Sequence, residues 1–426
     1  MSRFFIGVLL CCFVGQAANA QFEKYFREKT LRFDFYHCGD SRTECYYFDE
    51  LLEEPYWAGS KVTLVDTTGY GNQMFKIVDV ASGTVIYSRS YCTLFNEWQT
   101  TEEAGKTQKC MPEGVVFPYP KNDVRIELYA RNRQGSFEKK FEQTLRVDDY
   151  FIRKFTPCYE TFEVMYNGDP AHKVDIVLLP EGYAENEKEK FQQACEGFVR
   201  EFFSFSPFKE KASQFNVRAV WAPSAESGVT MPGEHVWRRT ALDAGFYTFG
   251  AERYQMVEDF QGIRDIAAHV PYEYVYVLSN TQKYGGGGIY NFYGISAANH
   301  PTRTGKIYVH EFGHVLLGLG DEYGSNAPYS DMYPADVEPW EENLTTLVDF
   351  GRKKIWKGLM DASTPVPTAV DKKKPERVGV YEGGGYVSKG VYRPWTNCLM
   401  NNLHATDRFC PVCSEAITRY VDWLCR

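Results

Sequence analysis

The stretch that decides the fold is 307-IYVHEFGHVLLGLGDEY-323. On an α-helix, residues four positions apart share a face, so His310 and His314 can direct their imidazoles to one point. Two imidazole nitrogens at this spacing suit a tetrahedral zinc ion. Glu311, the next residue round the helix, is placed to take a proton from a water molecule at the metal. The motif is HExxH, and it predicts a catalytic zinc site.

The surroundings of the motif favour a metal over a core helix with satisfied histidines. Between Ile307 and Leu319, the two imidazoles and one carboxylate are the only ionisable side chains apart from a tyrosine. Burying these polar side chains in an apolar helix costs free energy unless they are bound to a partner, and a divalent cation is such a partner.

The third ligand is expected just beyond the helix. A glycine such as Gly318 can adopt the left-handed conformation and turn the chain back toward the metal. Metzincins carry HExxHxxGxxH or HExxHxxGxxD. Here Leu317 stands at the expected glycine position, and both glycine and acid come one residue late. Asp321 is therefore the predicted third ligand, with Glu322 and Glu338 as alternatives.

Length and charge limit the class of protein. The 426 residues are enough for two or three domains. The net charge of -9 and the lack of any lysine-arginine run provide no basic surface for nucleic acid. Nucleic acid is therefore not an expected partner, and the sequence does not indicate the oligomeric state.

The N-terminus has the pattern of a cleaved secretion signal. Arg3 supplies the charge, residues 4–14 the apolar segment, and Ala18-Asn19-Ala20 the cleavage site. The apolar segment is too short to cross a bilayer, and no later stretch is long enough. A lipoprotein signal at Cys11 or Cys12 is the weaker alternative. The pattern predicts a secreted, periplasmic or cell-surface protein cleaved after Ala20.

Ten cysteines follow the signal, and in an exported protein they are disulfide candidates first. Cys38 with Cys45, and Cys92 with Cys110, each flank a short segment and are the expected local bridges. Four more form a C-x11-C-x2-C-x11-C pattern that would indicate structural zinc in the cytosol; disulfides are favoured here. They are Cys398, Cys410, Cys413 and Cys425.

Residues 21–148 are expected to form a β-sandwich accessory domain without a catalytic group. The predicted strands alternate in polarity or are rich in β-branched and aromatic residues. They are 30–36, 61–66, 73–79, 84–90 and 124–131.

Residues 150–426 change in character and are expected to form the catalytic domain. An apolar strand at 174–179 precedes a helix at 185–205, and further strands follow at 215–221 and 272–278. With the HExxH helix, this order predicts an α+β fold with helices packed on a twisted mixed sheet, as in zincins.

The glycine-rich stretch 284-YGGGGIYNFY-293 is the next unusual feature. It is not a phosphate loop, because no Lys-Ser or Lys-Thr follows. It forms either a hairpin tip or, from Ile289 to Tyr293, an edge strand that pairs with an extended substrate. The substrate-binding candidates on the second interpretation are Gly288, Ile289, Tyr290 and Asn291.

Downstream, 397-NCLMNN-402 resembles the Met-turn of metzincins, with Met400 as an apolar floor beneath the zinc. A methionine that only fills the core is the alternative. Tyr386 or Tyr392 is a candidate to donate a hydrogen bond to the oxyanion, and Tyr386 is our catalytic candidate beside Glu311.

Several segments together resemble the IgA-peptidase family of metallopeptidases. They are HEFGHVLLGLGDEY, YGGGGIYNFY, YRPWTNCLM, FCPVC and, near the N-terminus, 54-EPYWAG-59. The resemblance implies a metzincin-like catalytic domain preceded by a β-sandwich. It also implies one zinc ion held by His310, His314 and Asp321, with Glu311 as the catalytic base.

The expected function is that of a secreted zinc endopeptidase acting on extracellular proteins, of the immunoglobulin A or mucin kind. The alternative is a non-catalytic secreted binding protein built on a zincin scaffold. The intact His-Glu-His set favours the enzyme, because a binding protein would be free to lose Glu311.

Overall fold

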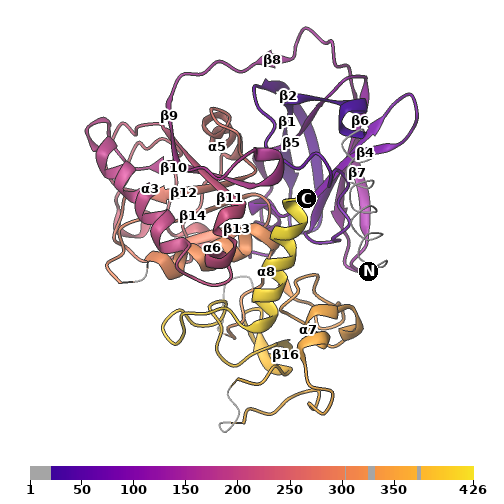
Figure 1. The fold of residues 1–426 in the computed structure, drawn as a ribbon, viewed down its shortest axis with the longest axis vertical. Coiled ribbons are helices and arrows are strands. Elements are labelled where there is room, and N and C mark those ends of the chain that lie inside the picture. Colours follow the sequence, from indigo (N-terminus) through magenta and orange to yellow (C-terminus); the bar gives the residue numbers. More distant parts are fainter. Residues whose placement is uncertain (1–20, 303, 325–331, 372–375) are drawn as a thin grey trace, which may run out of the picture.

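A computed structural model describes residues 21–302, 304–324, 332–371 and 376–426. The predicted signal, residues 1–20, lies outside the described residues. The chain mixes α and β structure in several sheets and has an N-terminal β domain, as the sequence predicted (Figure 1). Within the described residues, no helix combines the length and apolarity needed to span a membrane.

The N-terminal part consists of two four-stranded sheets. The first has the order β5-β1-β2-β8, with β1 (Phe26–Gly39), β2 (Glu44–Glu54), β5 (Lys109–Pro120) and β8 (Arg153–Lys154). The second has the order β4-β3-β6-β7, with β3 (Gln73–Asp79), β4 (Val85–Tyr91), β6 (Val124–Arg131) and β7 (Phe137–Leu145). Inward side chains of both sheets share one core, which includes Phe33, Phe35, Phe75 and Phe117.

The strand predictions for this part were right in places and wrong in others. The ranges 73–79 and 124–131 coincide with β3 and β6. The predicted strand at 61–66 is wrong, because this segment is irregular and has no strand partner among the described residues. It is held mainly by β4, where the Ser88 amide and the Arg89 side chain both donate to the Leu64 carbonyl. The long strands β2 and β5 were missed, since their charged and proline residues interrupt the alternation of polar and apolar residues by which a strand is recognised.

Both predicted local disulfides are wrong. The bond joins Cys38 to Cys110, and Cys45 and Cys92 are free thiols. β1 lies between β2 and β5, so Cys45 and Cys110 both stand opposite Cys38 in the register. Proximity along the chain favoured Cys45, but the partner comes from the other neighbouring strand.

A six-stranded mixed sheet forms the centre of the larger part. Its order is β13-β14-β12-β10-β11-β9, in which the four inner strands are parallel and the two edge strands antiparallel. The strands are β9 (Glu160–Met165), β10 (Val174–Glu181), β11 (Phe215–Trp221), β12 (Tyr274–Ser279), β13 (Gly286–Ile289) and β14 (Tyr293–Ala297).

Helices cover both faces of this sheet because its buried inner strands are apolar on both sides. Ile176 and Leu178 of β10 pack with α3 (Lys188–Phe202) and α6 (Thr304–Leu317). The alternate residues Val177 and Leu179 pack with α5 (Phe260–Ala267) and with α2 (Leu94–Trp98), which belongs to the N-terminal part.

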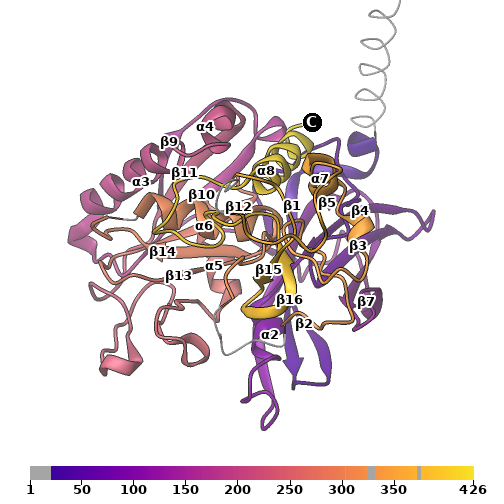
Figure 2. The ribbon, with the colours of Figure 1, turned by 90° about the horizontal axis from the view of Figure 1, so that it is seen from below.

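The C-terminal region closes the molecule beside α6, in orange to yellow in Figures 1 and 2. It contains α7 (Lys354–Leu359), β15 (Tyr381–Gly384), β16 (Val387–Arg393) and α8 (Pro411–Leu424). The short α4 (Phe208–Lys211) lies earlier in the chain. Six 3-10 turns also lie in the described part of the chain: Pro170–His172, Glu185–Glu187, Ala212–Gln214, Pro232–Glu234, Thr248–Gly250 and Phe350–Arg352.

Candidate active site

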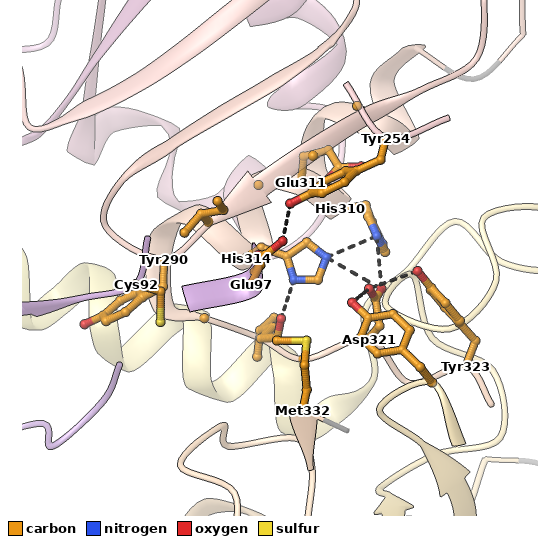
Figure 3. A pocket seen from close by; sticks show the side chains of 18 of the residues that line it. Cys92, Glu97, Tyr254, Tyr290, His310, Glu311, His314, Asp321, Tyr323 and Met332 are labelled. Carbon is orange, nitrogen blue, oxygen red and sulfur yellow. Dashed lines mark hydrogen bonds and ion pairs between the residues drawn. The ribbon is translucent and has the colours of Figure 1, made fainter. Parts of the chain in front are cut away.

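The two histidines of α6 converge on one point, as Figure 3 shows. Their Nε2 atoms lie 3.3 Å apart. His310 Nδ1 lies 2.9 Å from the Leu399 carbonyl oxygen, and His314 Nδ1 lies 2.5 Å from that of Leu319. Because a carbonyl can only accept, each Nδ1 carries a proton, and Nε2 is the nitrogen of each ring that binds a metal once it has lost its proton.

Gly318 ends the helix and brings Asp321 back to the histidines. Its φ of +65° is left-handed, and the amides of Gly318 and Leu319 donate to carbonyls in the last turn of α6. Asp321 Oδ1 then lies 3.3 Å from His310 Nε2 and 3.6 Å from His314 Nε2. Ligand atoms of a tetrahedral zinc are roughly 3.3–3.4 Å apart, so these three atoms fit one face of its coordination shell.

The second oxygen of Asp321 is occupied by two tyrosines. Oδ2 accepts from the hydroxyl of Tyr323 at 3.0 Å and from that of Tyr386 at 2.5 Å. Asp321 is almost fully buried, and these bonds orient its carboxylate. Tyr386 therefore lies in the site, but as a partner of Asp321. Tyr323 was missed by sequence reasoning, although it follows the acidic pair directly.

Glu322 and Glu338, the alternative ligands, lie apart from the histidines. Glu322 turns away toward buried cysteines, and Glu338 accepts hydrogen bonds from Thr346 and from the Asp349 amide. Tyr392 pairs through its backbone with Thr345 and does not line the cavity at the histidines.

His310, His314 and Asp321 stabilise one another's charged forms, although burial opposes the ionisation of each. Burial lowers the pKa of His314, but the neighbouring Asp321 raises it to about 9 overall. The pKa of His310 is raised as well, against the effect of burial, by Asp321 and Glu311. Burial opposes ionisation of Asp321, yet the two imidazoles hold its pKa well below the usual range. A divalent ion that binds here therefore displaces protons from the imidazoles.

Glu311 lines a cavity of about 410 Å³ above the histidines. Its side chain is half-buried, and burial raises its pKa above the ordinary value. A carboxylate with a raised pKa beside a potential metal site is suited to accept and return a proton.

The N-terminal part supplies one wall of this cavity, which sequence reasoning missed. Glu97 of α2 accepts a hydrogen bond from the hydroxyl of Tyr254 in the same cavity (Figure 3). Burial raises the pKa of Glu97 to about 7. No motif marks these positions, so nothing in the sequence pointed to them. The lining residues from the N-terminal part are Asn72, Cys92, Thr93, Asn96, Glu97 and Thr100.

The predicted edge strand from Ile289 to Tyr293 is wrong, because the edge strand lies earlier in the chain and consists mostly of the glycines. β13 spans Gly286–Ile289 and is the edge strand beside α6, and the chain then turns into β14. A Cβ on Gly288 would collide with the Glu311 carbonyl, so glycine is needed for the close approach of α6. Gly288 lines the cavity, and so do Ile289 and Tyr290, although both are largely buried. The side-chain amide of Asn291 instead donates to the Ser90 carbonyl at 2.9 Å.

Met400 lies in a turn below α6 and is fully buried. Its sulfur would be 3.2 Å from a Cβ on Gly313, which stands between the two histidines. Its carbonyl accepts from the Glu322 amide at 2.7 Å. The turn therefore contacts both the helix and the ligand loop.

Comparison with known families agrees with this geometry. The family model described as IgA Peptidase M64 matches residues 162–374 and 369–421, and the Peptidase M64 N-terminus model matches residues 21–142. The chain belongs to the IgA peptidase M64 family. It is therefore a peptidase, whose substrates are proteins or peptides. No curated protein matches this M64 peptidase.

Two groups of side chains in the described part of this M64 peptidase have the donor atoms for a metal ion. One is His310, His314 and Asp321. The other contains Glu322 and three cysteines. The first group has two imidazole nitrogens and one carboxylate oxygen, which suits a zinc ion that keeps a coordination position open.

Proposed function

We propose that this protein is a secreted, zinc-dependent endopeptidase with a metzincin-like catalytic domain. The observation that carries the proposal is the triangle of His310 Nε2, His314 Nε2 and Asp321 Oδ1, with sides of 3.3 to 3.6 Å. Three ligands of this kind with a free fourth position are typical of catalytic zinc in hydrolases. Secretion rests on the predicted signal at residues 1–20.

The proposed mechanism assigns proton transfer to Glu311. When bound, zinc supplies a Lewis acid for the scissile carbonyl and makes water more acidic. Glu311 accepts the proton of the attacking water and delivers it to the leaving amine. Asp321 is held in place by Tyr323 and Tyr386. Tyr386 is our candidate donor to the oxyanion; because a hydroxyl has one proton, it turns from Asp321 Oδ2 to the oxyanion while Tyr323 continues to hold Asp321.

The proposed substrate is an extended segment of an extracellular protein, of the immunoglobulin A or mucin kind. The edge strand β13 borders the cavity. Its Gly286 amide already donates to the Arg253 carbonyl, so the proposed pairing with an extended chain is at Gly288. The proposed organisation is a signal peptide at 1–20, an accessory domain at 21–148 and a catalytic domain at 150–426.

The test compares the wild type with Glu311→Gln and His310→Ala on a peptide library, with zinc content measured for each. Glu311→Gln should keep its zinc and lose at least about a hundredfold in kcat/KM. His310→Ala should lose both zinc and activity, and a chelator should inactivate the wild type reversibly. The cut sites also report the sequence preference.

Three results would contradict the proposal. Equal cleavage by Glu311→Gln and wild type would remove Glu311 from its role. Full activity in the presence of a chelator that strips all metal would exclude the zinc mechanism. Binding of glycoproteins without any cleavage would favour the non-catalytic alternative.

A further inference from the structure

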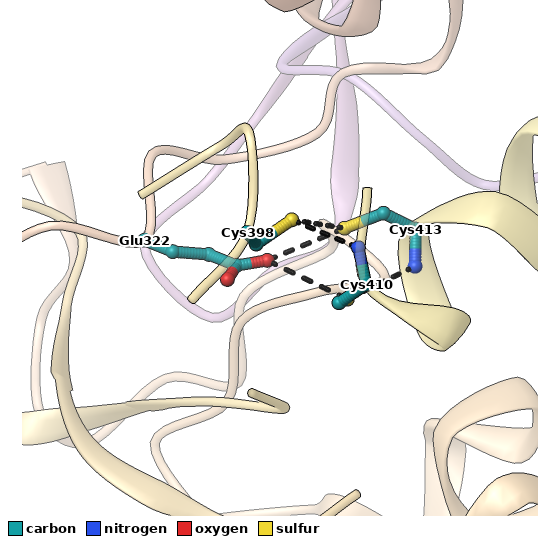
Figure 4. A group of neighbouring side chains, drawn as sticks. All are labelled: Glu322, Cys398, Cys410 and Cys413. Carbon is teal, nitrogen blue, oxygen red and sulfur yellow. Dashed lines mark hydrogen bonds between the residues drawn. The ribbon is translucent and has the colours of Figure 1, made fainter. Parts of the chain in front are cut away.

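Four buried side chains form a second cluster behind the active site, shown in Figure 4. They are Glu322, Cys398, Cys410 and Cys413, each at most 2% exposed. Cys398 Sγ lies 3.9 Å from Cys413 Sγ, and Glu322 Oε1 lies 3.3 Å from Cys413 Sγ and 4.0 Å from Cys410 Sγ. One ligand atom from each residue lies within 4.8 Å of all the others.

These separations match a tetrahedral metal shell. Thiolates at about 2.3 Å from zinc are roughly 3.8 Å apart, and a thiolate and a carboxylate oxygen are roughly 3.6 Å apart. Glu322 Oε2 is buried and accepts no hydrogen bond from the described residues. A buried carboxylate oxygen without a partner is costly, and a bound cation would remove that cost.

Neighbouring donors are arranged as they are around thiolate ligands. The Cys410 amide donates to Cys398 Sγ at 3.1 Å, and the Cys413 amide donates to Cys410 Sγ at 3.4 Å. The side-chain amide of Asn343 donates to Glu322 Oε1 at 3.0 Å. Cys410 also caps the N-terminus of α8, whose dipole favours negative charge there. All these donors stabilise anionic ligands.

We propose that Glu322, Cys398, Cys410 and Cys413 bind a second zinc ion. All four positions are supplied by the protein and the cluster is buried, so this ion is structural and does not contact substrate. The disulfides predicted for the C-terminal cysteines are wrong, because Cys398, Cys410, Cys413 and Cys425 are free thiols in this structure. One disulfide among three thiols leaves the third thiol unpaired and the buried Glu322 Oε2 without a hydrogen bond. Cys425 lies outside the cluster, against the Gln214 carbonyl.

The second site is connected to the first by two short backbone links. Glu322 follows Asp321 directly, and Cys398 precedes Leu399, whose carbonyl accepts from His310. A metal that fixes Glu322 and Cys398 therefore fixes the positions of Asp321 and of the carbonyl that orients His310. The existence of the second site does not depend on the proposed function, whereas this positioning role does.

The test uses the full mature chain loaded with Zn2+ or with Co2+ as a spectroscopic probe. The wild type should contain two zinc ions, and its cobalt form should show a thiolate-to-cobalt charge-transfer band in the near ultraviolet. A His310→Ala/His314→Ala variant should keep one ion and the band. Cys413→Ser should keep one ion, lose the band and bind the remaining zinc about tenfold more weakly. Cys425→Ser is the matched control and should retain both ions.

The proposal is overturned if the cobalt-loaded wild type shows no thiolate band and mass spectrometry finds a disulfide among Cys398, Cys410 and Cys413. These measurements on the wild type do not depend on any variant folding. A wild type that binds a single ion, with a thiolate band that persists in the His310→Ala/His314→Ala variant, would support the second site and contradict the catalytic zinc. The experiment therefore tests the two proposals independently.

Discussion

Asp321 uses its two carboxylate oxygens for different purposes. Oδ1 faces the two imidazoles, and Oδ2 accepts from two tyrosine hydroxyls. A carboxylate held in this way needs no reorientation when a metal binds. The hydroxyls of Tyr323 and Tyr386 should therefore contribute to metal affinity although neither is needed as a ligand.

We predict that Tyr386→Phe lowers the zinc affinity of the site by about 10- to 100-fold, because Asp321 loses its shorter hydrogen bond. Competition with a chromophoric chelator measures this affinity. Tyr392→Phe is the control, since Tyr392 does not line the cavity. Unchanged affinity with a large loss of kcat in saturating zinc would instead make Tyr386 a catalytic donor to the oxyanion.

At the scale of single elements, the end of α6 decides where Asp321 lies. Gly318 has a φ of +65°, and a Cβ there would collide with the indole of Trp340. The sequence allowed this turn to be anticipated, because glycine is the residue that left-handed helix ends favour. It did not reveal that an aromatic ring packs against the glycine from a distant loop.

Gly318→Ala should destabilise the protein by more than about 1–2 kcal/mol, the cost of a left-handed alanine, because the collision with Trp340 adds to it. It should also lower zinc content, since the ligand loop is displaced. Denaturant unfolding and elemental analysis measure the two effects. The control is Gly358→Ala in α7, where a Cβ meets nothing within 4 Å and should be neutral or stabilising. A Gly318→Ala protein as stable as wild type would contradict the strain argument.

In the first sheet of the N-terminal part, His37 of β1 lies between two carboxylates, Glu113 on β5 and Glu44 on β2. Its Nδ1 lies 3.2 Å from Glu113 and its Nε2 lies 3.1 Å from Glu44, and the ring is fully buried. Burial lowers the pKa of His37, but the two carboxylates outweigh burial and raise it above the ordinary value of 6.5. The pKa of Glu44 is lowered in turn by His37, against the effect of burial.

The folded protein therefore binds a proton at His37 more tightly than the unfolded chain does. The stabilisation from His37 should be complete below pH 6.5 and should disappear as the pH rises through the higher pKa of the folded state. His37→Gln should remove this dependence, so that the difference in Tm between wild type and variant shrinks between pH 6 and 9. Thermal unfolding across that range is the measurement, and a constant difference would contradict the charged bridge.

The sequence predicted those parts of the site that depend only on the geometry of one helix and its end. The i,i+4 spacing of His310 and His314 placed both rings on one face, and Asp321 followed the helix-ending glycine. Contacts between distant segments were not predictable. The Leu399 carbonyl that orients His310, and the pairing of Cys38 with Cys110, depend on which strands and turns become neighbours. Glu97 reaches the cavity from a helix in the other part of the chain.

For the whole molecule, the two parts share a hydrophobic core as well as the cavity. Val177 and Leu179 of the central sheet pack in one cluster with Leu94, Phe95 and Trp98 of the N-terminal part. The N-terminal part thus covers a face of the catalytic sheet that α5 covers only partly. An accessory role limited to docking would not require this shared core.

We therefore predict that residues 149–426 expressed alone do not form a stable enzyme. Exposing the apolar face that α2 covers costs roughly 25 cal/mol for each Å², and the cavity loses the wall that contains Glu97. Expressed alone, this part should be largely insoluble or unfold without a cooperative transition, whereas co-expression with residues 21–148 should restore a soluble, zinc-containing complex. Solubility, thermal unfolding and peptide cleavage distinguish the two preparations. A C-terminal part that folds and cleaves as well as the full chain would show that the shared core is dispensable and that the N-terminal part is an independent module.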